Sequence, residues 1–182
     1  HLNKRPAVAL AEWGAAPGSC PNVIYRHLFS VESTGTQNQS WLVAQGFEPG
    51  TKNATLAAAQ RMMSVGKKAV PRVGAAVALR PCYDGWALAA TRGHLFCSLP
   101  LPDASGLPSH VNGFFDLNSS RTEPSHGHLA GDAAICVEWN RALAEEALPA
   151  IVDRLFKSVP ERTKERDPSG AYAVWPGTDY LS

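Results

Sequence analysis

Five stretches of the chain carry the alternating or short continuous apolar patterns that are typical of strands. They are residues 22–32, 40–47, 71–81, 93–101 and 109–118. Only a turn-rich run, TGTQNQ, separates the first two, and we predict that they form an antiparallel hairpin. In the third stretch branched apolar residues alternate with Gly and Ala, which favours close packing under a helix.

Two stretches have the longer period of a helix. Residues 54–65 are rich in helix-forming residues, and Asn53 or Thr55 is expected to cap them. Residues 133–159 repeat apolar residues at three- or four-residue steps around Pro149, where we expect the helix to kink or restart. The residues of this stripe are Ile135, Trp139, Leu143, Ala147, Ile151 and Leu155.

This order of elements predicts an α+β two-layer sandwich with a mixed or antiparallel sheet and a long C-terminal helix. A doubly wound parallel sheet would need a regular alternation of strands and helices, which the pattern lacks. A chain of 182 residues can bury a core without a disulfide or a metal. We predict a single domain over 1–182, with an N-terminal lead-in segment at 1–21, an α+β core at 22–158 and a turn-rich C-terminal segment at 159–182.

The charges of the chain are balanced, with 17 Lys and Arg residues against 16 Asp and Glu residues. This balance gives no electrostatic reason to expect nucleic acid or an anionic membrane as a partner. The sequence contains no apolar run of 18 residues, so no membrane-spanning helix is expected. Asn38, Asn53 and Asn118 begin Asn-x-Ser/Thr triplets, which would accept glycans in a secreted protein. We favour instead a piece of a longer cytosolic protein, because no signal peptide precedes the first strand.

Few of the patterns that carry chemistry are present. The chain has no phosphate-binding loop and no GxGxxG, HExxH or GxSxG signature. His126 and His128 lie close to Asp132, but no further ligand has a recognised spacing, so no metal is expected. The cysteines are too far apart for a CxxC pair: Cys20, Cys82, Cys97 and Cys136.

An alternative function is a small independent hydrolase or transferase that uses Cys and His residues. His94 and Cys97 are the nearest pair, but three residues apart in a strand they should point to opposite faces. We therefore expect the cysteines to be structural and the chain not to be an enzyme by itself. A thiol reagent separates the two functions, because buried structural cysteines should react slowly until the protein unfolds.

Residues 109–118, SHVNGFFDLN, differ from an ordinary core strand because one face would carry Asn112, Phe114, Asp116 and Asn118. Either the strand is half exposed and Gly113 marks a bulge or a close backbone approach, or this face meets a partner. The binding candidates are Asn112, Asp116 and Asn118, and the residues expected to be critical for the fold are Trp139, Phe115 and Leu143.

Four short motifs resemble, in the same order, the repeat region of sacsin and the sacsin-like proteins. They are FCSLPLP at 96–102, GLP at 106–108, HVNGFF at 110–115 and WNR at 139–141. The family pattern runs as a strand of the type GRAFCFLPLP, then TGLPVHVNGFF, a short turn rich in Asn and Arg, and a helix beginning WNRLLLEDVVAPA. The resemblance is strong over about 70–156 and weaker over 22–46.

In that family each large repeat is similar to the ninety-kilodalton heat-shock chaperones, with an ATP-binding domain of the GHKL class followed by a second domain. The acidic N-box and the Gly-rich lid motifs of the first domain are absent from this sequence. The resemblance therefore implies a non-catalytic, middle-type domain of a cytoplasmic co-chaperone in protein folding or quality control. Its partners would be the adjacent ATPase domain and client proteins or other chaperones. ATP with magnesium would bind to the neighbouring domain, and this chain would hold no cofactor.

In the chaperones a middle domain directs a cation to the γ-phosphate of the nucleotide next door, where positive charge stabilises phosphoryl transfer. The family's turn after HVNGFF usually carries Asn-Arg-Arg. Here the turn reads NSSRT, so Arg121 keeps one arginine position and Thr122 stands at the other. The resemblance thus assigns Arg121 to a γ-phosphate contact in trans. Asn112 is expected to bind the adjoining domain or to fix the turn at 118–122.

Overall fold

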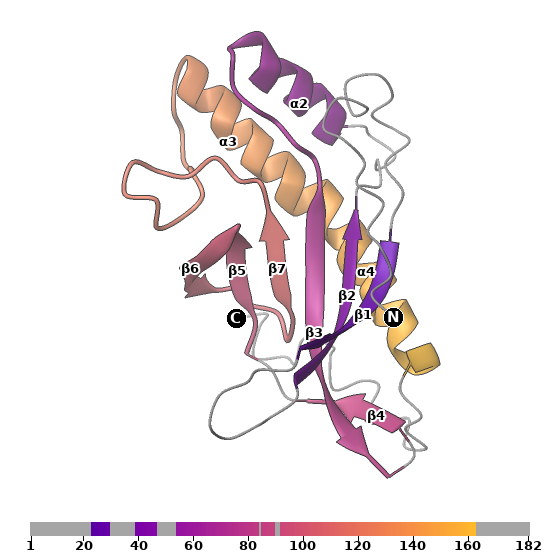
Figure 1. The fold of residues 1–182 in the computed structure, drawn as a ribbon. Coiled ribbons are helices and arrows are strands. Elements are labelled where there is room, and N and C mark those ends of the chain that lie inside the picture. Colours follow the sequence, from indigo (N-terminus) through magenta and orange to yellow (C-terminus); the bar gives the residue numbers. More distant parts are fainter. Residues whose placement is uncertain (1–22, 30–38, 47–53, 84, 90–91, 163–182) are drawn as a thin grey trace.

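The computed structural model describes residues 23–29, 39–46, 54–83, 85–89 and 92–162. They form an α+β sandwich of two layers, a mixed sheet and a layer of helices, as predicted (Figure 1). The strands are β1 (Val23–Phe29), β2 (Gln39–Gly46), β3 (Val73–Cys82), β4 (Gly85–Leu88), β5 (His94–Cys97), β6 (Leu99–Ala104) and β7 (His110–Gly113). Their order in the sheet is β1-β2-β3-β7-β5-β6, and β4 pairs with the C-terminal end of β3. Neighbouring strands are antiparallel except β5 and β7, which run parallel.

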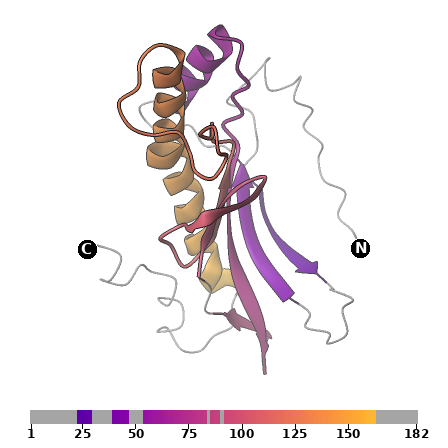
Figure 2. The ribbon, with the colours of Figure 1, turned by 90° about the vertical axis from the view of Figure 1, so that its left-hand side faces the viewer.

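The helices cover one face of this sheet (Figure 2). Three helical segments follow one another without a break: α3 (Asp132–Ala142), the π-helical turn η2 (Leu143–Ala147) and α4 (Leu148–Arg162). The remaining helix, α2 (Ala54–Ser64), packs beside α3 (Figure 1). The predicted lead-in segment 1–21 lies outside the described residues, and so does the part of the predicted C-terminal segment that follows α4.

The hairpin predicted for the first two strands is confirmed, because β1 and β2 pair antiparallel with Tyr25 opposite Val43. The side chains of β1 and the connecting residues 30–38 lie outside the described part of the chain. The predicted helix at 54–65 is also confirmed, as α2. Strand β4 was not expected, since four residues are too few to show a period.

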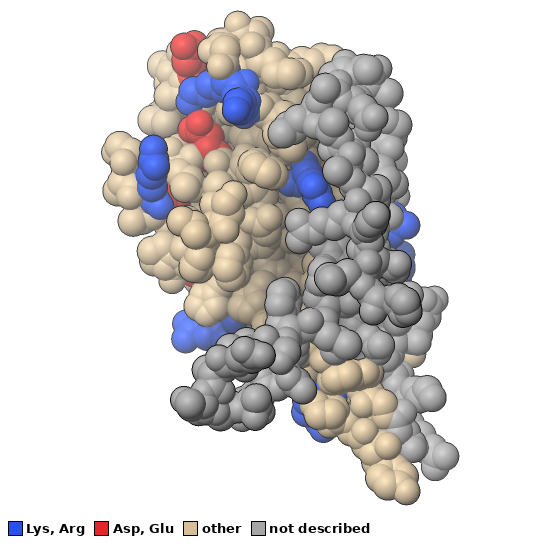
Figure 3. Space-filling view, in the orientation of Figure 1, with Lys and Arg blue, Asp and Glu red and all other residues tan. Residues whose placement is uncertain are grey.

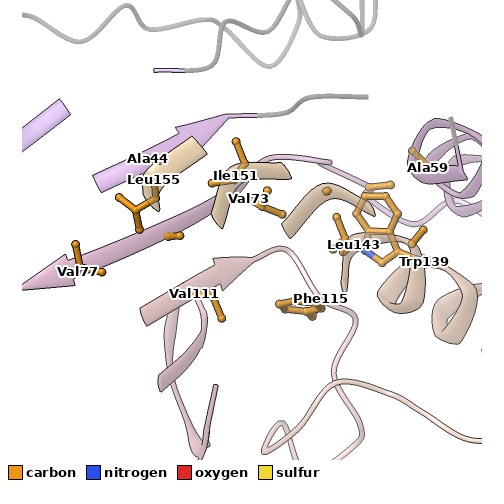
Figure 4. Packing of buried hydrophobic residues seen from close by; sticks show 14 of the residues in the cluster. Ala44, Ala59, Val73, Val77, Val111, Phe115, Trp139, Leu143, Ile151 and Leu155 are labelled. Carbon is orange, nitrogen blue, oxygen red and sulfur yellow. The ribbon is translucent and has the colours of Figure 1, made fainter. Parts of the chain in front are cut away.

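The core lies between the sheet and the helices (Figure 4). The inward positions of β2 and β3 include Leu42 and Val77, which are almost fully buried as the alternation predicts. Trp139, Leu143 and Phe115, the residues expected to be critical for the fold, belong to the same buried cluster. Their predicted place in the core is therefore confirmed.

The break in the helix that was expected at Pro149 is a π-turn that ends just before this residue. Pro149 has no N–H to donate to the preceding turn, and the Leu148 N–H bonds back to the Leu143 carbonyl across five residues. The α-helix resumes as α4 from Leu148, so the interruption predicted at Pro149 is confirmed, as a π-turn. Side chains four residues apart drift by about 40° per step around an ordinary α-helix, and the wider π-turn offsets part of this drift. The stripe residues that remain fully buried on both sides of the turn are Trp139, Leu143, Ala147, Ile151 and Leu155.

The first turn of α2 is capped from another helical segment. The N–H and the hydroxyl of Thr55 donate to Oε2 of Glu146 in η2 at 2.6 and 2.7 Å. A carboxylate at this position satisfies a terminal N–H and complements the helix dipole. Thr55 thus lies inside the helix and is not the cap that was predicted, while Asn53 lies outside the described residues.

Residues 93–101 do not form the single strand that their pattern predicts. The chain reverses at Ser98, and β6 returns antiparallel beside β5. Ser98 has a φ of 64°, a left-handed conformation that costs a non-glycine residue about 1–2 kcal/mol. Its N–H donates to Oδ1 of Asn112 at 3.2 Å, which helps to hold the turn. A side chain from β7 supports this reversal, so the local apolar pattern could not show it.

The strand predicted at 109–118 is shorter than expected, because β7 ends at Gly113. The alternation holds as far as the strand runs, with Val111 buried and Asn112 exposed. A Cβ atom at Gly113 would lie 2.8 Å from the ring of Phe115. Of the two explanations that the sequence left open for this glycine, the structure supports the close approach.

Candidate functional site

The chain leaves the sheet after β7 because two side chains of α3 bind its main-chain groups. Trp139 Nε1 donates to the carbonyl of Phe114 at 2.8 Å. Asn140 Oδ1 accepts the N–H of Asp116 at 2.8 Å, and Asn140 Nδ2 donates to the Asp116 carbonyl at 2.7 Å. A further strand pair would need these same groups. The strand therefore stops and a loop begins, on the left of Figure 1.

The same amide also closes this loop. Asn140 Nδ2 donates a second hydrogen bond to the carbonyl of Ser125 at 2.9 Å, and the Ser125 N–H donates to the Asp116 carbonyl at 2.8 Å. Asn140 is only 6% exposed, and both of its N–H donors are used. Residues 114–125, held at both ends by Trp139 and Asn140, are called the clamped loop below.

Asn118 builds a tight turn within the clamped loop. Its Oδ1 accepts the N–H of Thr122 at 3.1 Å and the hydroxyl of Ser120 at 2.9 Å. Its carbonyl accepts the N–H of Arg121 at 2.9 Å. The turn is therefore fixed by Asn118, and the expectation that Asn112 fixes it is wrong, since Asn112 binds the β5–β6 turn instead.

Arg121 is exposed at this turn. Its φ of 58° lies in the left-handed region, and the bonds of Asn118 hold it there. Among the residues that the structure describes, its guanidinium has no hydrogen bond or ion-pair partner. A guanidinium is planar and donates paired hydrogen bonds to phosphate or carboxylate. A fixed backbone with an unengaged guanidinium is thus suited to bind an anion from outside the domain.

Asp116, another predicted binding residue, is engaged within the domain. Its Oδ1 accepts from Lys67 Nζ at 2.9 Å, and its Oδ2 accepts from the Ser125 hydroxyl at 3.3 Å. The structure thus brings Asp116, Asn118 and Arg121 together in one loop and leaves Asn112 on the strand before it.

Sequence reasoning did not single out Asn140 or Lys67. An Asn in the middle of a helical pattern is unfavourable by propensity, because its side chain competes for backbone groups. That mismatch, together with its place in the WNR motif at 139–141, was the available signal. Lys67 follows α2 without any motif, so its contact with Asp116, 49 positions away, had no signal in the sequence.

Lys67 lies between the clamped loop and α3. Its Nζ is 2.9 Å from Asp116 Oδ1 and 2.9 Å from Cys136 Sγ. The hydrogen bond to Cys136, followed by the one to Asp116, raises the pKa of Lys67 above its ordinary value. Cys136 is 2% exposed, and its thiol also donates to the carbonyl of Asp132 at 3.2 Å.

Two histidines lie together on the sheet face opposite Val111. The rings of His94 and His110 stack at a centroid distance of 5.7 Å, and Trp41 lies 5.1 Å from His110. The backbone N–H of His94 donates to Nδ1 of His110 at 3.0 Å, so the proton of the neutral His110 ring is on Nε2. Burial, and then the charge of His94, lowers the pKa of His110.

Cys97 has a different partner from His94. Its Sγ donates to the carbonyl of Phe115 at 3.4 Å. Burial raises the pKa of Cys97, which leaves less of the reactive thiolate at neutral pH. Within the described ranges no Cys makes a hydrogen bond to a His.

Charges and possible metal ligands are dispersed. Figure 3 shows the basic side chains of one face spread out, without a continuous basic stripe among the described residues. No group of three His, Cys, Asp or Glu side chains in the described part of the chain is placed to hold a metal ion. His126 Nδ1 instead lies 3.1 Å from the carbonyl of Pro124. Among the described helices, none combines the length and apolarity needed to cross a bilayer.

Comparisons with protein-family models, with curated proteins and with solved structures gave no match to this chain. The resemblance to the sacsin-like repeats stays a prediction that rests on the sequence motifs. The structure adds one relationship between them: HVNGFF at 110–115 and WNR at 139–141 are joined by the bond from Trp139 Nε1 to the Phe114 carbonyl.

Proposed function

We propose that the chain is a non-catalytic, middle-type domain of a sacsin-like co-chaperone in the cytoplasm, resembling a chaperone middle domain. It works in protein folding or quality control with a neighbouring domain that binds ATP and magnesium. Client proteins or other chaperones are its further partners. The observation that carries the proposal is the clamped loop, in which two of the resembling motifs hold a turn that exposes Arg121.

Arg121 supplies a positive charge to the γ-phosphate of ATP bound in the neighbouring domain. Its guanidinium donates to two phosphate oxygens and offsets the charge that develops during phosphoryl transfer. Because Asn118 and the clamp already fix the backbone, little of it remains to be ordered when the domains dock. Thr122, at the second arginine position of the family turn, lies 2.8 Å from the Ser120 hydroxyl within the loop. The proposal therefore assigns a single cation to the phosphate.

The test is ATP turnover by a longer protein in which this chain follows its ATP-binding domain. Arg121→Asn removes the charge and keeps a residue that tolerates a left-handed φ. We expect turnover to fall roughly 100-fold, as it does when one donor to a developing charge is lost. Arg121→Lys keeps the charge without the paired donors and should lose less.

Arg92→Ala is the matched control, because Arg92 is also exposed but precedes β5, at the end of that strand opposite the Ser98 turn. Its turnover should equal that of the unchanged protein. Wild-type turnover in a folded Arg121→Asn protein would show that Arg121 makes no catalytic contact with the nucleotide.

A further inference from the structure

The contact between Lys67 and Cys136 has no part in the proposed function and brings an amine and a thiol together. Nζ and Sγ are 2.9 Å apart, although the residues are 69 positions apart in the chain. Cys136 is 2% exposed, whereas the side chain of Lys67 is 42% exposed. The sulfur also hydrogen-bonds to the carbonyl of Asp132, which is not a nucleophile. The amine is thus placed to react first with an oxidised sulfur.

We propose that Lys67 and Cys136 form a reversible sulfur–nitrogen crosslink when a peroxide oxidises Cys136. In the first step the sulfur attacks one oxygen of hydrogen peroxide and the O–O bond breaks. The products are a sulfenic acid at Cys136 and water, so the sulfur loses two electrons and the peroxide gains them.

The second step is a condensation without further oxidation. The Lys67 nitrogen, once neutral, attacks the sulfenic sulfur, the S–N bond forms, the S–O bond breaks, and the hydroxide leaves as water with one proton from that nitrogen. Before the attack the ammonium must release another proton, because only the neutral amine has a lone pair. Asp116 Oδ1, 2.9 Å from Nζ, is placed to accept this proton and pass it to solvent. Sulfenic acids condense with nitrogen in the same way when they form backbone sulfenamides.

Burial and contact favour this product over the competing ones. A second protein or a thiol as large as glutathione has little access to Cys136, which is 2% exposed. The Lys67 nitrogen is already within hydrogen-bond distance of the sulfur, so its effective concentration is high. Cys136 and Asp116 raise the pKa of Lys67 and so keep it as the ammonium. The rate of the condensation should therefore increase as the pH rises.

The crosslink would act on the clamped loop. It joins the segment after α2 to α3, and it removes the positive charge that now pairs with Asp116. Oxidation would in this way weaken one of the contacts that hold the loop. This inference does not depend on the proposed ATP-linked function, because the crosslink needs only the fold.

The test is to treat the full chain with hydrogen peroxide and to map the products by intact mass and peptide mass spectrometry. We expect a loss of two hydrogen atoms, linked peptides that contain Lys67 and Cys136, and full reversal by dithiothreitol. Lys67→Arg keeps the positive charge and should abolish the link, so that Cys136 proceeds to sulfinic acid. Lys68→Arg is the control and should leave the link intact.

Other products would overturn the proposal. They are a disulfide of Cys136, a link to a different lysine or to the backbone, and a link that retains an oxygen atom. Sulfinic acid or an unchanged thiol at Cys136 in the wild type, as in Lys67→Arg, would overturn it as well. The wild-type peptide map alone distinguishes these products, so the test does not depend on whether the variants fold.

Discussion

Asn140 binds both main-chain polar groups of Asp116 with a single side chain, by accepting from the N–H at 2.8 Å and donating to the carbonyl at 2.7 Å. An adjacent strand makes the same pair of bonds with its backbone. The amide on α3 therefore takes the place of the next strand partner at the point where β7 has ended. This substitution turns the chain out of the sheet and fixes the loop that exposes Arg121.

Replacement of Asn140 tests the clamp. Asn140→Ala should lower the free energy of unfolding by about 3 kcal/mol, because it removes three part-buried hydrogen bonds and leaves the Asp116 N–H and the Ser125 carbonyl without this partner. Asn112→Ala, which removes one bond from an exposed amide, should cost less than about 1 kcal/mol. Urea unfolding of both variants measures the difference. Equal losses would show that the Asn140 bonds do not hold the loop.

Trp139 is predicted to contribute both apolar volume and one hydrogen bond. Trp139→Ala should cost about 3–5 kcal/mol, as large aromatic truncations do. Trp139→Phe keeps most of the ring but leaves the Phe114 carbonyl unpaired, so we expect a loss of about 2 kcal/mol. Thermal and urea unfolding give both values. If the Phe variant were as stable as the wild type, the Nε1 hydrogen bond would not be a cause of the end of β7.

His110 should make the protein less stable in acid. Its pKa is lowered by burial and by His94, so the folded state binds a proton more weakly than the unfolded state does. The contribution to stability is complete above about pH 6.5 and is lost as the pH falls from there through the folded pKa. His110→Asn offers Oδ1 to the His94 N–H and should reduce this loss. Unfolding measured at about pH 7.5 and 5.5 compares the two proteins, and an unchanged pH dependence would exclude His110 as its source.

Cys97 should react slowly with a thiol reagent in the folded protein. Burial raises the pKa of its thiol, so the thiolate is scarce at neutral pH. Unfolding should increase the labelling rate by at least about tenfold, because it removes the burial. Peptide-resolved alkylation with and without urea measures both rates. Rapid labelling of Cys97 in the folded state would instead favour the Cys- and His-dependent enzyme.

The sequence predicts the parts of the fold that depend on local periodicity. The hairpin of β1 and β2, helix α2 and the buried stripe of α3 and α4 all follow from the need to bury one face of each element. The turn that contains Asn118 and Arg121 could also be predicted, because both residues follow the HVNGFF motif within a few positions.

The remaining features depend on contacts between distant segments. The reversal at Ser98 is held by Asn112, 14 positions away, and the end of β7 is set by Asn140, which lies 24 positions from Asp116. The local patterns of residues 93–101 and 109–118 therefore predict longer strands than the structure contains. No local pattern shows which backbone groups a distant side chain will bind.

The most direct test of the proposed function is ATP binding and turnover, measured on this chain alone and on a longer protein that includes the proposed ATP-binding domain. We expect that only the longer protein binds and hydrolyses ATP, and that Arg121→Asn slows its turnover. Binding and turnover of ATP by the isolated chain would contradict the account, because a nucleotide site would then lie within this chain itself.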